Sequence, residues 1–145
     1  MPIIYNEDKK IFSLHTKNTT YQMMVDKYGY LLHLYYGSLN KGDMDYSLIG
    51  ADRGFSGNPY VAGKERTYSL DTLPQEYPTL GTGDYRNYAL DIKNSDGTHC
   101  VNLKFVSYEI EKGKYSLKGL PAVWAAENEA DTLKIVMEDS ISNIE

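Results

Sequence analysis

The stretch of sequence that decides the fold covers residues 11–37 and reads IFSLHTKNTTYQMMVDKYGYLLHLYYG. At its start the side chains alternate, so that Phe12 and Leu14 share one side of an extended chain, as in a half-buried strand. Clusters of turn-forming residues interrupt the apolar runs, and Gly37 ends the last run. We therefore predict three antiparallel strands joined by turns: 11–15, 21–25 and 30–36. The third is almost entirely apolar, which is typical of a strand covered on both faces.

The remaining sequence continues as short strands and turns without long helical periodicity. The apolar pattern shifts between Phe105 and Val106, which indicates either a β-bulge or burial on both faces. Asp-Gly at 96–97 predicts a hairpin turn. The segment 122–130, with the only tryptophan, Trp124, has helix-forming composition, but it is short and lies between predicted strands, so we interpret it as a loop or edge segment. Further strands are predicted at 68–70, 89–93, 101–110 and 132–138. The predicted fold class is all-β, an antiparallel β-sandwich.

Composition indicates one globular domain and excludes several partners. The 145 residues are 41% hydrophobic and 24% charged, which is ordinary for a folded domain. The net charge is −5 with no basic run, so we expect no nucleic-acid partner. No apolar run is long enough for a membrane span, and no secretory signal is visible near the N-terminus. Cys100 has no partner for an internal disulfide, and a reducing cytoplasm is the expected location.

A complete catalytic site is missing from the sequence. There is no phosphate-binding glycine loop and no nucleophile elbow. His15, His33 and His99 lie far apart, so we expect neither a metal site nor a cofactor. Asp43 and Asp45 form an acidic pair, but loop carboxylates are usually only solvated. The 14 tyrosines suit a β-rich fold and would also suit a sugar-binding surface, and both interpretations stay open.

Residues 38–66 form a long segment rich in glycine and aspartate, and a loop of this length in a compact domain is uncommon unless it has a function. Six blocks in order, most of them within or after this segment, resemble the N-terminal region of the bacterial α-galactosidases of glycoside hydrolase family 36. They are YLLHLYYG (30–37), DRGFSGNP (52–59), RTYSLD (66–71), LPQEYP (73–78), GDYR (83–86) and GLPA (119–122). The resemblance extends over almost the whole chain.

The resemblance implies an enzyme that hydrolyses terminal α-linked galactose from melibiose, raffinose and stachyose with retention of configuration. In that family both catalytic aspartates belong to a central (β/α)₈ barrel, which this sequence does not contain. Residues 1–145 would then be one β-sandwich domain, part of an N-terminal β-supersandwich, without a catalytic residue and inactive alone. Residues 139–145 read as a turn and the start of another strand, which agrees with a fragment of a larger β architecture.

The family also suggests a role for the long loop. Many members are homotetramers in which this loop reaches a neighbouring subunit and lines its sugar pocket. Carried over to this sequence, the candidates for substrate binding are Asp52, Arg53 and Phe55, with Arg66 just beyond. An aspartate accepts hydrogen bonds from sugar hydroxyls, an arginine donates or braces the aspartate, and a phenylalanine packs on an apolar sugar face.

The other interpretation of the same four residues is structural: the charged side chains brace a surface loop and Phe55 fills the core. The blocks at 76–78 and 83–86 are interpreted as fold-defining turns, held by Asp–Arg and Glu–backbone contacts. An alternative for the whole chain is a stand-alone carbohydrate-binding β-sandwich module, in which exposed tyrosines would stack on sugars. Such a module would close its sheets within this length and bind galactosides unaided.

Overall fold

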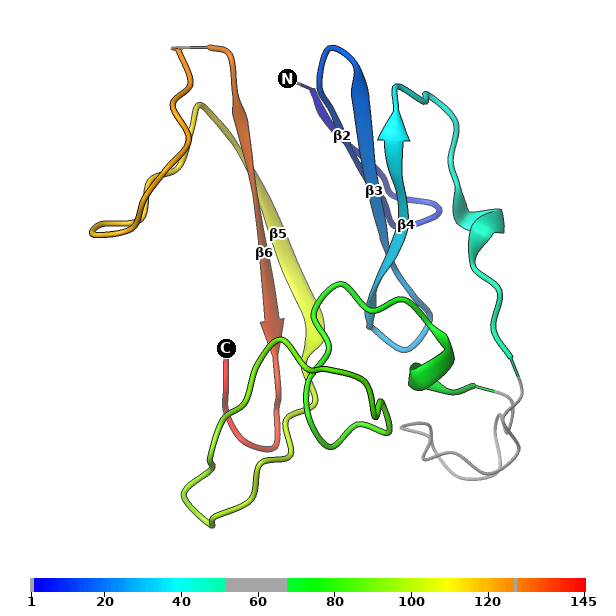
Figure 1. Ribbon diagram of the computed structural model, residues 1–145, viewed down its shortest axis with the longest axis vertical. Coiled ribbons are helices and arrows are strands. Elements are labelled where there is room, and N and C mark those ends of the chain that lie inside the picture. Colours follow the sequence, from blue (N-terminus) through cyan, green and yellow to red (C-terminus); the bar gives the residue numbers. More distant parts are fainter. Residues whose placement is uncertain (1, 52–67, 127) are drawn as a thin grey trace.

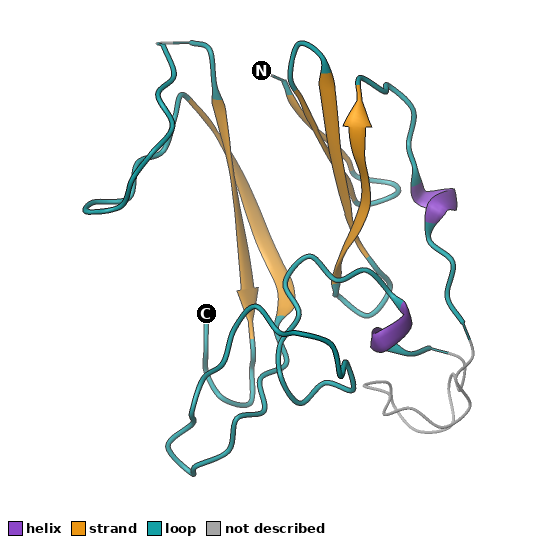
Figure 2. Ribbon diagram, in the orientation of Figure 1, coloured by secondary structure: helices purple, strands orange, loops and turns teal. Residues whose placement is uncertain are grey.

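The computed structural model describes residues 2–51, 68–126 and 128–145 of the chain. In this part of the chain two antiparallel sheets face each other, and helix is limited to two short 3-10 turns (Figures 1 and 2). The four-stranded sheet has the order β1-β2-β3-β4 and the second sheet pairs β5 with β6. The strands are β1 (Ile3–Asn6), β2 (Ile11–His15), β3 (Thr19–Val25), β4 (Leu31–Ser38), β5 (Lys104–Lys112) and β6 (Asp131–Glu138). The 3-10 turns are η1 (Asp45–Ser47) and η2 (Leu70–Thr72). The all-β fold class is therefore confirmed.

Alternation along β2 and β3 assigns side chains to the two faces of the large sheet. Phe12 pairs with Met23 across the two strands, and both point towards the second sheet, whereas Ser13 pairs with Gln22 on the opposite face. One bulge interrupts the pairing of β3 with β4 between Gln22 and Met23, where Leu34 has no partner of its own. The bulge shifts which side chains of β4 share a face with those of β3.

An aromatic and aliphatic core fills the space between the sheets. The ring of Phe12 is fully buried and stacks on Tyr5 at a centroid distance of 4.4 Å. From the second sheet, Tyr108 meets Phe12 edge-on at 5.1 Å and Phe105 lies at 6.1 Å. Aromatic pairs of this kind stabilise the fold by more than the burial of their surface alone. Because Phe12 contacts aromatic rings from both sheets, it is the centre of the sandwich.

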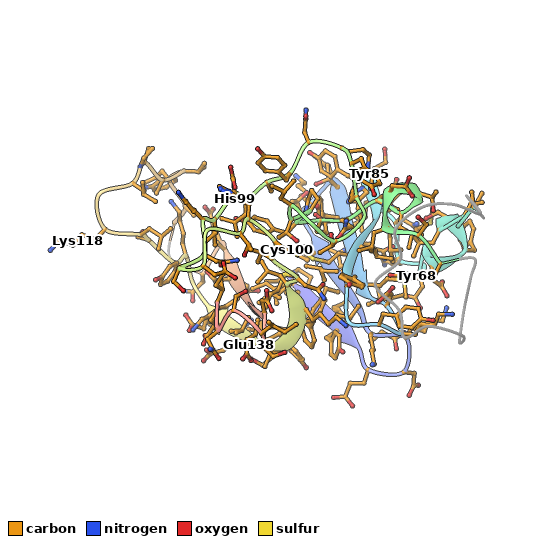
Figure 3. All side chains as sticks on the ribbon, turned by 90° about the horizontal axis from the view of Figure 1, so that it is seen from below. Tyr68, Tyr85, His99, Cys100, Lys118 and Glu138 are labelled. Carbon is orange, nitrogen blue, oxygen red and sulfur yellow. The ribbon has the colours of Figure 1, made fainter. Side chains whose placement is uncertain are left out.

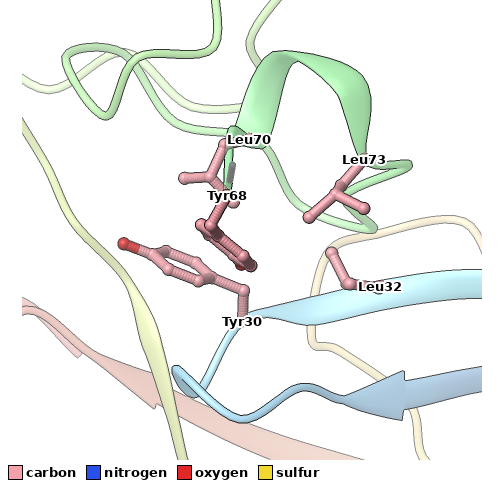
Figure 4. Close-up of a cluster of buried hydrophobic side chains, with 5 residues drawn as sticks. All are labelled: Tyr30, Leu32, Tyr68, Leu70 and Leu73. Carbon is pink, nitrogen blue, oxygen red and sulfur yellow. The ribbon is translucent and has the colours of Figure 1, made fainter. Parts of the chain in front are cut away.

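A second core lies on the outer face of the large sheet. Tyr30 and Leu32, at the start of β4, pack against Tyr68, Leu70 and Leu73 (Figure 4). Leu31, between them, points into the inter-sheet core. The prediction that this run is covered on both faces is thus confirmed for the first half of β4.

Strand predictions succeeded where regular pairing exists. The strand 11–15 is confirmed as β2. The predicted strands at 21–25, 101–110 and 132–138 correspond to β3, β5 and β6 with shifted ends. The strand predicted at 30–36 corresponds to β4, which continues past Gly37 to Ser38. The predicted bulge appears as a register shift between Phe105 and Ser107. A turn forms at the predicted Asp-Gly pair, with a positive φ of 86° at Gly97, but no strand ladder flanks it in the described residues, so the predicted hairpin is wrong. Strand β1 was missed. The strands predicted at 68–70 and 89–93 are wrong.

Within the described residues, neither of these two segments has a neighbouring strand to pair with. After Tyr68 the chain bends into η2, with the Leu73 N–H donating to the Leu70 carbonyl at 3.2 Å. In the other segment, Leu90 forms a single isolated bridge with Thr79. Apolar β-formers make a strand only when a ladder is available, and that depends on tertiary placement.

Candidate functional site at the base of the glycine-rich loop

The four predicted substrate-binding residues, Asp52, Arg53, Phe55 and Arg66, lie outside the described residues. What the structure does describe is the chain on either side of these residues, which we call the loop base. The chain leaves this base at Ala51 and returns at Tyr68, on the outer face of the large sheet (Figure 1). The Ala51 N–H donates to Thr72 Oγ1 at 3.5 Å, which links the departing chain to the returning one.

Tyr68 anchors the returning chain to the sheet. Its hydroxyl donates to Asp26 Oδ2, and the other oxygen of that buried carboxylate accepts the N–H groups of Tyr28 at 2.8 Å and Tyr30 at 2.9 Å. Burial, followed by the hydrogen bond to Asp26, raises the pKa of Tyr68 far above its ordinary value. The phenol therefore stays a donor at all physiological pH values. Sequence reasoning missed this anchor, because no pattern relates residues 42 positions apart.

Arg86 and Asp84 hold the segment that follows. The guanidinium donates to Asp84 from Nε at 2.8 Å and from Nη2 at 2.7 Å, and Nη2 also reaches the carbonyls of Leu70 at 3.0 Å and Leu73 at 2.5 Å. These carbonyls belong to η2 and the residue after it. Gln75 Nε2 adds a bond to Asp84 at 2.8 Å. The predicted Asp–Arg contact is thus confirmed, and it fixes the chain just downstream of the loop.

The electrostatics of this pair favour ionisation of both groups. The Asp84 side chain is 1% exposed, and burial alone would raise its pKa. The hydrogen bonds from Arg86 and Gln75 outweigh burial and hold the pKa of Asp84 below its usual value. The hydrogen bond to Asp84 raises the pKa of Arg86 in turn. A charge-assisted pair with two additional carbonyl acceptors makes a rigid support.

The departing limb, residues 39–47, is fixed on the polar half of the outer face. Gln22 Nε2 donates to the Gly42 carbonyl at 3.0 Å, and Gln22 Oε1 accepts the Met44 N–H at 3.2 Å. Asp43 and Asp45 both bind Lys9, at 3.4 and 3.1 Å. These two aspartates therefore join the loop to the β1–β2 turn. Among the described residues no group of acidic, histidine or cysteine side chains is placed to hold a metal ion.

Glu76 forms a second polar cluster, on the inner face of the large sheet. Its carboxylate accepts the Tyr21 hydroxyl and lies 2.8 Å from His33 Nδ1. The backbone N–H of Glu76 donates to the Leu31 carbonyl at 2.9 Å. The expectation of a Glu–backbone contact is corrected here: the side chain binds two side chains, and only the main chain of Glu76 binds backbone. Burial, then the bond to Glu76, raises the pKa of Tyr21 well above its ordinary value.

Two hollows accompany these clusters. One, of about 480 Å³, adjoins Tyr68, Asp26 and Thr72 at the loop base. The other, of about 580 Å³, is an apolar groove open between the two sheets. Its walls are mainly apolar side chains from both sheets, from the segment between β4 and β5 and from the residues after β6: Met23, Leu31, Leu90, Ile92, Leu103, Ile135, Met137 and Ile144. In the described residues no helix is long and apolar enough to cross a bilayer.

Comparison with known proteins decides the family. The model of the glycosyl hydrolase family 36 N-terminal domain matches residues 29–145. This chain belongs to that family. Among the curated relatives, the bifunctional α-galactosidase/sucrose kinase AgaSK of Mediterraneibacter gnavus is 66% identical over the whole chain, which covers 16% of that protein. The α-galactosidase Mel36A of Lactobacillus acidophilus is 40% identical over 99% of the chain, which covers 20% of its length.

Solved structures of family 36 enzymes carry the same fold. The galactosidase domain of AgaSK superposes with a TM-score of 0.92 at 67% identity, over 97% of this chain and 20% of that one. The α-galactosidase AgaA of Geobacillus stearothermophilus, in complex with raffinose, gives 0.84 at 37% identity, over 92% of this chain and 19% of that one. The chain thus spans a fifth or less of the length of these relatives.

Proposed function

We propose that this chain is the non-catalytic N-terminal part of an α-galactosidase that releases terminal α-linked galactose from raffinose-type oligosaccharides with retention. The observation that supports the proposal is the family 36 match over residues 29–145, together with 66% identity to AgaSK along the whole chain. The relatives are enzymes about five or more times as long as this chain. The proposal assigns the reacting groups to the part of such an enzyme that this chain does not cover. A cytoplasmic location goes with the proposal.

The role assigned to the domain is to support assembly and to line a sugar pocket. The loop that contains Asp52, Arg53 and Phe55, with Arg66 at its end, would reach the pocket of a neighbouring subunit in a homo-oligomer, with a tetramer as the expected assembly. The loop base favours this role, because Tyr68 is bound to Asp26 at the end of β3 and Arg86 holds the carbonyls of Leu70 and Leu73 in the returning chain. A loop that positions substrate needs such a rigid mount.

The open groove between the sheets supports a larger architecture around this domain. Leu90 and Ile92 at its wall are only partly buried, and side chains of both sheets and of the segments outside them complete the lining. An apolar surface of this kind marks a place where further protein packs. We infer that in the longer enzyme another part of the polypeptide covers it.

Two proteins test the proposal: the chain alone, and a chimera in which it replaces the matching N-terminal residues of AgaSK. Hydrolysis of raffinose is measured for both. We expect turnover by the chimera and none by the chain alone. Turnover by the stringently purified chain would overturn the proposal, and so would a folded but inactive chimera.

Calorimetric titration of the chain with raffinose tests the carbohydrate-binding alternative. No heat at millimolar sugar is the expected result. Saturable heat would favour a stand-alone sugar-binding module.

A further inference from the structure

A tight turn at residues 94–98 contains Asp96, the only aspartate of the chain that a glycine directly follows. The Asn94 N–H donates to the Thr98 carbonyl at 2.8 Å, and the Gly97 N–H donates to the Asn94 carbonyl at 2.9 Å. Gly97 has a positive φ of 86°, a conformation that favours glycine. Asp96 and Gly97 are both exposed, on the same side of the molecule as His99 and Cys100 in Figure 3. The turn therefore holds an Asp-Gly pair at the surface in one defined conformation.

An aspartate that precedes a glycine can rearrange without an enzyme. The main-chain nitrogen of the glycine attacks Cγ of the protonated aspartate side chain, a C–N bond forms, and the side-chain hydroxyl leaves with the amide proton as water. The resulting succinimide ring then takes up water. Opening at the main-chain carbonyl gives isoaspartate, in which the chain runs through Cβ and Cγ, whereas opening at Cγ restores aspartate. The overall change is an isomerisation, so it needs neither an oxidant nor a reductant.

Sequence and structure together single out Asp96 among the aspartates of the chain. The residue that follows must be small, because its side chain would cover the attacking nitrogen, and a Cβ at Gly97 would meet nothing within 4 Å. The next smallest follower is Ser140, after Asp139. Asp139 is only 4% exposed, and its carboxylate accepts the N–H groups of Asn102 at 3.0 Å and Ile141 at 2.9 Å. Its side chain is therefore held inside the fold, whereas that of Asp96 meets water.

Thr98 stabilises the unreactive, charged form of the Asp96 side chain. Asp96 Oδ1 accepts the Thr98 N–H at 2.9 Å and the Thr98 hydroxyl at 2.7 Å. Asn94 Nδ2 donates to the same hydroxyl oxygen at 3.0 Å, which leaves the hydroxyl proton for Asp96. The two bonds from Thr98 lower the pKa of Asp96 below its ordinary value. The protonated carboxyl, the form that can lose its hydroxyl, is therefore scarcer at neutral pH.

We propose that Asp96 is the site at which this chain forms isoaspartate, and that the Thr98 hydroxyl keeps the reaction slow in the folded state. The attacking nitrogen is restrained as well, because the Asn94 carbonyl accepts its proton at 2.9 Å. The modification adds one carbon to the main chain between Ile92 and Leu103, two residues that line the groove between the sheets. The inference does not depend on the function proposed above.

Peptide mapping of the aged chain tests the proposal. The folded chain and the chain unfolded in urea are kept at neutral pH for several weeks, and fragmentation that distinguishes the two isomers locates isoaspartate along the sequence. We expect isoaspartate at Asp96 in both samples, with formation several-fold slower in the folded chain, because unfolding removes the bonds from Thr98. Deamidation of the neighbouring Asn94 changes the mass of the peptide, so it is measured separately.

Three variants isolate the hydroxyl. Thr98→Val removes the hydroxyl and keeps the shape and the main-chain N–H, so it should react several-fold faster than the parent chain when folded and equally fast in urea. Thr98→Ser keeps the hydroxyl and should stay as slow as the parent chain. Thr16→Val is the matched control, since Thr16 Oγ1 also bonds main-chain N–H groups in an exposed turn, and it should leave the rate at Asp96 unchanged. Far-ultraviolet circular dichroism checks that every variant is folded.

Several outcomes would overturn the proposal. Isoaspartate could accumulate at another aspartate before Asp96, or the folded chain could react as fast as the unfolded one. The Thr98→Val variant could react no faster than the parent chain, or Thr98→Ser could react as fast as Thr98→Val, which would assign the protection to the shape of the side chain. None of these results bears on raffinose hydrolysis by the AgaSK chimera, so the two proposals fail separately.

Discussion

Arg86 illustrates how one side chain fixes several turns. Replacement by lysine keeps the charge but removes the planar fork, so the carbonyls of Leu70 and Leu73 lose their donor. We expect Arg86→Lys to lower the free energy of unfolding by about 1–3 kcal/mol, the cost of leaving buried acceptors unpaired. Urea unfolding measures the change. The control is Lys93→Gln at an exposed position, and an equal effect of both variants would contradict the prediction.

The partner of Arg86 makes stability depend on pH. Because hydrogen bonds hold the pKa of Asp84 below its ordinary value of 3.8, the pair stabilises the fold above that pH, and the gain is lost as the pH falls through the lowered pKa. Asp84→Asn should therefore destabilise the chain more at pH 7 than near pH 3. Urea midpoints of both proteins over this range provide the test. A constant difference between the two proteins would refute it.

The contact between the two sheets depends on elements far apart in sequence. Phe12 of β2 meets Tyr108 of β5 in the centre of the sandwich, and its ring is fully buried. Phe12→Ala should cost about 3–5 kcal/mol of unfolding free energy, because it removes the ring and leaves a cavity between rigid layers. Denaturant unfolding measures it. Ile4→Ala, at a side chain that is 52% exposed, should cost far less, and a similar loss would argue against a core centred on Phe12.

The prediction of strands succeeded where a strand pairs with its neighbour in the sequence, and it failed where pairing depends on the tertiary structure. The meander β2–β3–β4 uses neighbouring strands and short turns, so alternation in the sequence predicts it well. The bulge near Val106 is also local, since it shifts the side-chain parity of one strand. Segment 89–93 has the composition of a strand but no neighbour to complete a ladder. Residues 3–6 form a strand because β2 offers them an edge.

At the scale of the whole molecule, a loop that only lines a sugar pocket should contribute to substrate binding and not to bond cleavage. In the AgaSK chimera, Asp52→Asn should raise the KM for raffinose roughly tenfold and change kcat little, because a charged hydrogen bond to a sugar hydroxyl acts on ground state and transition state alike. Steady-state kinetics provide the measurement. Asp8→Asn, in the exposed β1–β2 turn, is the matched control. A fall in kcat at unchanged KM would contradict a binding role.

The family and the fold class followed from the sequence alone, because period-two alternation, turn residues and six ordered blocks are properties of the chain itself. The Asp84–Arg86 ion pair could also be predicted from the sequence, since its members are two residues apart. Only the tertiary structure decided the rest. It placed the Tyr68 hydroxyl on Asp26, bound Glu76 to Tyr21 and His33, left an apolar groove between the sheets and exposed Trp124 in the connection between β5 and β6. These contacts join residues distant in sequence, and burial and hydrogen bonding between such residues exist only once the sheets have packed.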